Sequence, residues 1–355
     1  MARSRRSSGN RRKNKKHGTA RVWLWLTAAA LLFVIYFSYR IFRPNTYPFR
    51  EKTYFYIPTG STYADVLKGL KQQHIVRNVK DFDWLARKLG YPHHVHPGRY
   101  AIKPGMSNLQ LVHILYSGKQ APVRLVITKL RTKADLIRLV SHHLEADSLS
   151  MATLLSDEIY LRQYGLDTNT ALCAIIPNTY FFFWNTSAEG FFKRMMQAYN
   201  RFWDSTRLQE AQKLGLTPQE VIILASIVEE ETNHNAEKPL IASVYLNRLR
   251  KGMRLAADPT VKFALGDFSI RRIYNKYTLV RSPYNTYLYK GLPPGPICTP
   301  SPATIDAVLH APQTDYLYFC ARADFSGSHV FASTYAEHLK NARKYQAALD
   351  SLHIQ

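Results

Sequence analysis

The sequence has few cysteines, and none of them are spaced to hold a metal. Its 355 residues include only Cys173, Cys298 and Cys320, which lie far apart and form no CxxC pair. Zinc clusters and disulfide scaffolds both need closely spaced cysteines, so neither is expected. Three buried free thiols are favoured, although one disulfide stays open if the chain is exported to an oxidising compartment.

Histidine motifs of metallopeptidases are also missing. The clusters at 93–96 and 142–143 lack the HExxH spacing that puts two imidazoles on one helix face. We interpret them as solvated loop and helix-face residues. No metal and no other cofactor is expected, and a cell-wall metallopeptidase is disfavoured because no His/Asp/Glu triad can be assembled.

Acidic residues are absent from residues 1–21, which carry nine lysines and arginines. Such a stretch cannot collapse on a core and is predicted to be a solvated basic tail. The formal net charge of +23 does not by itself indicate nucleic-acid binding, because nine of these charges lie in the tail and +14 is left for the rest. That excess suits an anionic polymer or a membrane surface. We expect no nucleic-acid partner.

Charge disappears altogether from Val22 to Tyr39, where Trp and Tyr residues flank an apolar run. About 18 apolar residues can cross a bilayer as a helix. A cleaved signal peptide would have a shorter apolar region and a small-residue cleavage site, but bulky residues follow here, and a buried core helix is the other alternative. We expect a transmembrane helix over 22–42 in the cytoplasmic (inner) membrane, with the tail cytoplasmic and the rest outside, on the periplasmic side.

A small domain is expected over 51–120. The pattern predicts a strand at 53–57, helices at 63–72 and 80–89, a strand at 98–102 and a helix at 107–115. The β-α-α-β order and the stretch Pro97–Gly105 resemble a LysM-like glycan-binding module. A structural spacer is the alternative.

A larger mixed α+β domain is expected over 121–355, so the whole chain is assigned to the α+β class. A strand is predicted at 123–127, and helical patterns dominate after Leu130. The aromatic run at 178–184 could stack on sugar rings, but its density favours a place in the core.

One helix start in this domain is unusually well marked. Thr217 can cap the helix, Pro218 suits its first position and Glu220 can complete a capping box. The residues that follow, 221–228, are apolar on every face, which predicts a buried helix.

That helix ends in three adjacent glutamates, Glu229, Glu230 and Glu231. They repel one another at the negative end of the helix dipole. Glu231 falls on the stripe of Leu224 and Ile227, so we expect it to point inward, and burial should raise its pKa towards the range of a general acid. From these residues alone, a solvated acidic helix end is the alternative.

The surrounding motifs decide between these interpretations. Most of residues 217–340 resembles the endolytic murein transglycosylases of the MltG or YceG-like family. The matching motifs are Ala225–Thr232, Ala242–Leu249, Gly252–Val261, Ser282–Tyr287, Gly291–Ile297, Asp315–Phe319, His329–Phe331 and Tyr335–His338.

The resemblance implies an activity for the chain. The catalytic glutamate of the family falls on Glu231, and the implied reaction is lytic cleavage of peptidoglycan between N-acetylmuramic acid and N-acetylglucosamine, which leaves 1,6-anhydro ends. Peptidoglycan glycan strands are the expected partner, with cell-wall synthases as a further candidate, and the stem peptides would suit the basic excess. Candidates for orienting the sugar are the motif Asp258–Thr260 and the motif Tyr284, Asn285, Thr286 and Tyr287, with Glu229 and His329 as further candidates, although capping or turn formation would explain each of them equally well.

The chain departs from the family pattern in two places. Asn178 stands where an aspartate is usual, and Leu339 follows His338 where an asparagine is common. These departures put an acidic role at position 178 in doubt and leave Glu231 untouched. The alternative from another functional class is a membrane-tethered peptidoglycan-binding scaffold without activity, against which the intact Glu231, Asp258 and 284–287 motifs argue.

Overall fold

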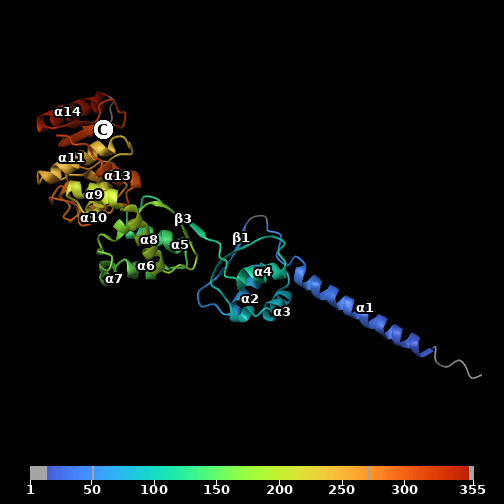
Figure 1. The fold of residues 1–355 in the computed structure, drawn as a ribbon. Helices are drawn as coiled ribbons and strands as arrows, with labels where there is room; N and C mark the ends of the chain where they lie inside the picture. Colours follow the sequence, from blue (N-terminus) through green and yellow to red (C-terminus); the bar gives the residue numbers. More distant parts are fainter. Residues whose placement is uncertain (1–13, 50–51, 271, 352–355) are drawn as a thin grey trace, which may run out of the picture. The chain divides into compact units, whose positions relative to one another are not determined.

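The computed structural model describes residues 14–49, 52–270 and 272–351, so most of the predicted basic tail lies outside the described residues. The chain divides into two compact units, which we call unit 1 (up to Pro122) and unit 2 (from Val123). The chain is a mixed α+β protein in which runs of helices are interrupted by short strands (Figure 1).

Unit 1 begins with the long helix α1 (Asn14–Phe42). Its segment Arg21–Phe42 has 22 residues and is long and apolar enough to cross a membrane, and none of its most apolar stretch is buried against the protein. The helix end contacts the rest of unit 1. Arg40 forms an ion pair of 2.5 Å with Asp81 and lies over the Trp84 ring, 4.8 Å from its centroid.

The remainder of unit 1 has the predicted order of elements. These are β1 (Thr53–Ile57), α2 (Tyr63–Gln72), α3 (Val79–Lys88), η1 (Tyr91–His93), β2 (Gly98–Ile102) and α4 (Asn108–Tyr116). β1 and β2 pair antiparallel, with Phe55 opposite Tyr100. Both rings are fully buried in the apolar core of the unit, and capping boxes at Thr62 and Ser107 begin α2 and α4.

Unit 2 has two short sheets and ten helices longer than one turn among its described residues. Its elements are β3 (Val123–Ile127), α5 (Lys133–His143), α6 (Ser148–Leu154), α7 (Glu158–Arg162), η2 (Ala171–Ala174), β4 (Asn178–Phe182), α8 (Ala188–Phe202), α9 (Ser205–Leu214), α10 (Pro218–Glu231), α11 (Lys238–Arg250), α12 (Asp258–Leu265), η3 (Tyr277–Leu279), α13 (Pro302–Leu309), β5 (Tyr318–Ala321), β6 (His329–Ala332) and α14 (Tyr335–Ser351). β3 pairs with β4 and β5 with β6, both antiparallel.

Helix α10 is buried within unit 2, as its sequence predicts. The capping box between Thr217 and Glu220 is present, and every residue from Val221 to Val228 is buried. The helix packs against α11, α12 and α13. Because its body is enclosed, the position of its last residues is set by three neighbouring helices.

The aromatic run at 178–184 is less buried than its density predicts. Its first half forms β4, in which Tyr180 and Phe182 face the core while Phe181 and, just beyond the strand, Phe183 are more than half exposed. The cause is the alternation of side chains along a strand, which sends every second ring to solvent when one face of the sheet is uncovered. The three cysteines are free thiols, and Cys173 and Cys298 are buried.

Candidate active site

The three glutamates at the end of α10 differ in their partners and in the effect that burial has on them. All three side chains have intermediate solvent exposure, but Glu231 is the one of the three for which burial outweighs the neighbouring groups and raises the pKa, as the sequence pattern predicts. At about 100° per residue, consecutive side chains on a helix point in different directions. Each carboxyl therefore contacts a different set of neighbouring residues.

Glu229 forms a buried ion pair. Its Oε2 accepts hydrogen bonds from Lys238 Nζ at 3.1 Å and Ser301 Oγ at 3.0 Å, and a very short one from the Thr304 hydroxyl. Burial would raise the pKa of this carboxyl, but the hydrogen bonds from Thr304 and Lys238 outweigh it, and the pKa is lowered. Lys238 is itself only 5% exposed. The arrangement ties α10 to α11 and α13.

Glu230 also meets cations. Lys129 lies 2.9 Å from one of its carboxyl oxygens and Arg131 donates to the other at 3.0 Å. Burial again acts to raise the pKa, while hydrogen bonds from Arg131 and Lys129 lower it below its ordinary value. Glu230 is therefore ionised at neutral pH and neutralised by its partners.

Glu231 has no cation in direct contact among the described residues. The Tyr245 hydroxyl of α11 donates a short hydrogen bond to its Oε1. Burial, reinforced by the nearby charge of Asp258, raises the pKa of Glu231 to about 7, although the Tyr245 hydrogen bond and the charges of Lys262 and Arg248 act to lower it. This carboxyl is the one of the three that holds a proton near neutral pH.

Asp258 contributes a second carboxylate near Glu231. It begins α12, and its Oδ1 accepts a hydrogen bond of 2.6 Å from the Tyr287 hydroxyl. Burial, the hydrogen bond to Asp258 and the charges of both carboxylates raise the pKa of Tyr287. Asp258 therefore belongs to the same cluster as Glu231, as its motif suggests.

Asn285 and Thr286 shape the loop that carries Tyr287. Asn285 is fully buried, and its Nδ2 donates to the carbonyls of Thr278 and Val280 at 2.9 and 2.8 Å. Thr286 accepts from Ala257 N at 3.0 Å, which fastens the loop to the start of α12. Both side chains use their polar atoms inside the protein, and the result is the position of Tyr287 against Asp258.

Tyr284 and His329 have no direct contact with Glu231 among the described interactions. The Tyr284 ring packs on Phe263 with centroids 4.7 Å apart, and burial raises the pKa of its hydroxyl to about 12. His329 Nδ1 lies 2.9 Å from Glu237 Oε2. The Phe319 ring contacts both the His329 ring and the Tyr245 ring, with centroids 5.3 and 5.9 Å apart.

One residue of the cluster, Tyr245, is absent from the candidates chosen from sequence. Tyr245 lies in the motif Ala242–Leu249, where its helical spacing gives no sign that it faces a carboxyl of another helix. Tyr287 closes the 284–287 motif, and its role depends on the fold of the loop. The cluster is thus Glu231, Tyr245, Asp258 and Tyr287, drawn from α10, α11, α12 and one loop.

This geometry defines a class of protein. A carboxyl that is half protonated near pH 7 can give a proton to a leaving group and take one from a nucleophile, which is what general acid–base catalysis requires. The cluster thus has the properties expected of an acid–base site. The chain belongs to the YceG-like family, whose model matches residues 55–344.

Relatives and a solved structure agree with this assignment. An endolytic murein transglycosylase of Bacillus subtilis (strain 168) is 30% identical over 305 residues, which cover 81% of this chain and 83% of that protein. One of Streptococcus pneumoniae serotype 2 (strain D39) is 27% identical over 344 residues, with 87% of this chain and 62% of the longer protein covered. The crystal structure of a YceG-like protein from Listeria monocytogenes aligns with a TM-score of 0.54 and 30% identity, over 82% of this chain and 99% of that one. The resemblance expected from the motifs is confirmed.

Proposed function

We propose that the protein is a peptidoglycan lytic transglycosylase that cuts glycan strands in their interior. The observation that carries the proposal is the raised pKa of Glu231, about 7, in a cluster with Asp258 and two tyrosines. Family membership and the names of the relatives, endolytic murein transglycosylases, support the substrate class.

Glu231 would act first as the acid. It gives its proton to the oxygen that joins C1 of N-acetylmuramic acid to N-acetylglucosamine, and the C1–O bond breaks. The N-acetylglucosamine side leaves as an alcohol, and positive charge develops at C1 of the muramic residue. Asp258 adds a second negative charge to the cluster, which favours that oxocarbenium-like centre.

Glu231, now ionised, would then act as the base. It takes the proton of the C6 hydroxyl of the same muramic residue while that oxygen bonds to C1. The product is a 1,6-anhydro end, the carboxyl regains its proton and no water is consumed. Hydrolases need a second carboxylate to activate water or form a covalent intermediate, whereas an internal hydroxyl already has a high effective concentration.

The remaining candidate residues have different roles in the proposed reaction. Asp258 orients the sugar with the Tyr287 hydroxyl, and Asn285 and Thr286 act through the loop that they hold. Substrate contacts of Glu229, Tyr284 and His329 stay predictions, since each side chain already has partners in the protein.

Anchoring and strand binding complete the proposal. The α1 segment Arg21–Phe42 would hold the enzyme in the cytoplasmic membrane with unit 2 outside, where it would terminate or trim nascent strands. The β-α-α-β part of unit 1 would bind glycan as a LysM-like module.

Mass spectrometry of the products from purified peptidoglycan tests the reaction. We expect strands ending in 1,6-anhydro-muramic acid, about 18 mass units lighter than hydrolysis products because one water is not added. Products with reducing ends would show that water is the nucleophile, and Asp258 would then be the first candidate for its base. Binding without any product would favour the scaffold alternative.

A further inference from the structure

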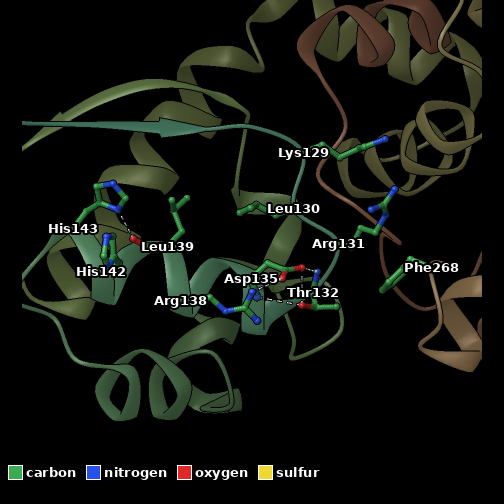
Figure 2. Close-up of a pocket in the computed structure, with 10 residues that line it drawn as sticks. All are labelled: Lys129, Leu130, Arg131, Thr132, Asp135, Arg138, Leu139, His142, His143 and Phe268. Atoms are coloured by element: carbon green, nitrogen blue, oxygen red, sulfur yellow. Dashed lines mark hydrogen bonds and ion pairs between the residues drawn. The ribbon is translucent and has the colours of Figure 1, made fainter.

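A basic groove lies in unit 2 beside the end of α10. Its volume is about 660 Å³, and it is lined by Lys129, Arg131, Arg138, His142, His143 and Phe268, among others. Figure 2 shows that Lys129 and Arg131 stand on the segment after β3 and that Arg138 and both histidines stand on α5. Phe268 comes from the segment after α12.

The charge of the groove favours an anion. Three cationic side chains and two imidazoles line it against a single carboxylate, Asp135. Glu230 satisfies part of the charge of Lys129 and Arg131. Arg138 stays 78% exposed, with Asp135 no closer than 3.8 Å. The planar guanidinium of an arginine can donate two parallel N–H hydrogen bonds to a carboxylate.

The groove continues towards the catalytic cluster. A second, smaller cavity shares Arg131 and Phe268 with it and is also lined by Glu230 and Lys262. The charge of Lys262 acts on Glu231. The Arg131 guanidinium lies over the Phe268 ring, 5.0 Å from its centroid, and both residues line both cavities. The smaller cavity is also lined by Pro259, so the groove is connected through shared residues to the neighbours in sequence of both Glu231 and Asp258.

We propose that this groove binds the acidic stem peptide of the muramic residue at the cleavage site. The inference rests on the proposed function and adds to it the recognition of the peptide. In a peptide-bearing strand the sugars are uncharged and the lactyl carboxyl of the muramic residue is tied up in the amide bond to the peptide, so the carboxylates of the stem peptide are the anions that this cationic groove would meet. Arg138 and His142 contact the peptide carboxylates, while the Phe268 ring offers an apolar surface for its alkyl groups.

Selectivity between two substrates tests the proposal on the full chain. The ratio of kcat/KM on peptide-bearing strands to kcat/KM on amidase-stripped strands is measured for the wild type, Arg138→Glu and the double variant Arg138→Ala with His142→Ala. We expect the variants to lower this ratio about fivefold to tenfold, chiefly through KM, because exposed charge pairs contribute modestly.

Lys193→Glu is the matched control, since it makes the same charge change at an exposed position on α8. It should keep the wild-type ratio. An unchanged ratio in both groove variants, or an equal fall in the control, would overturn the groove proposal while cleavage of both substrates leaves the proposed function standing. Failure of the wild type to cleave either substrate would instead contradict the proposed function.

Discussion

Two kinds of electrostatic environment occur at the end of α10, although they are one residue apart in sequence. In one kind, Glu229 and Glu230 are each bound by cations, Lys238 for the first and Lys129 and Arg131 for the second, and their pKa values are lowered. In the other kind, Glu231 accepts a hydrogen bond from a hydroxyl and lies near Asp258, and its pKa is raised.

The difference separates carboxylates that stabilise the fold from a carboxyl that can transfer a proton. An ion pair holds a carboxylate in its charged form and contributes to the fold, so it cannot supply a proton at neutral pH. A buried carboxyl without a bound cation keeps its proton up to higher pH, and its ionisation lowers the stability of the folded state. Three substitutions of the same kind, glutamate to glutamine, should therefore have opposite consequences in the two environments.

The largest effect on stability is expected for Glu229→Gln. The change leaves Lys238 buried and charged without its partner, and breaking a buried pair from one side costs about 3–5 kcal/mol. Chemical denaturation should show a lower free energy of unfolding. Glu230→Gln is the matched control, because its partners are about a third exposed and the loss should be smaller. An equal fall in the free energy of unfolding of both variants would contradict a larger contribution of the Lys238–Glu229 ion pair.

Glu231→Gln should stabilise the protein at neutral and higher pH. The folded state has a pKa of about 7 against an ordinary value of 4.5, so the folded state binds the proton more tightly and wild-type stability falls as pH rises through this window. The full cost above pH 7 is about 3 kcal/mol. The variant should gain about that much at pH 8 and nothing at pH 4. A destabilised variant at pH 8 would show that Glu231 is held as a carboxylate.

Tyr245→Phe should give the smallest of these effects. The wild-type kcat/KM should fall above about pH 7, because the acid is lost as Glu231 ionises. Removing the hydroxyl that lowers the pKa of Glu231 should move this alkaline limb to higher pH. Tyr199→Phe, at a buried tyrosine on α8, should leave the profile in place. A shift to lower pH would contradict the assigned hydrogen bond.

Local patterns predict much of this fold. The bounds of β1, α2, β2 and β3 agree with those expected from alternation and capping residues, and the buried helix after Thr217 begins at its capping box. These features depend on neighbours in sequence. The aromatic run around β4 was predicted wrongly, because which face of a sheet is covered depends on distant elements.

The site is predictable only in part for the same reason. The apolar stripe of α10 and the motifs point to Glu231, and the motifs also point to Asp258, but the sequence does not show which groups surround each of the three glutamates. What separates them is Lys238, Lys129, Arg131 and Tyr245, each from another segment. The position of Tyr287 likewise depends on a loop that Asn285 and Thr286 close.

The activity of Glu231→Gln compared with Glu230→Gln on long peptidoglycan strands tests the central claim most directly. Glutamine is close to glutamate in shape and lacks the titratable proton, so Glu231→Gln should fold, bind glycan and lose activity by about 10²–10⁴-fold, nearer the upper figure because one group serves both steps. Glu230→Gln should keep most of its activity. An active Glu231→Gln, with strands released at close to the wild-type rate, would contradict the assignment of the catalytic residue.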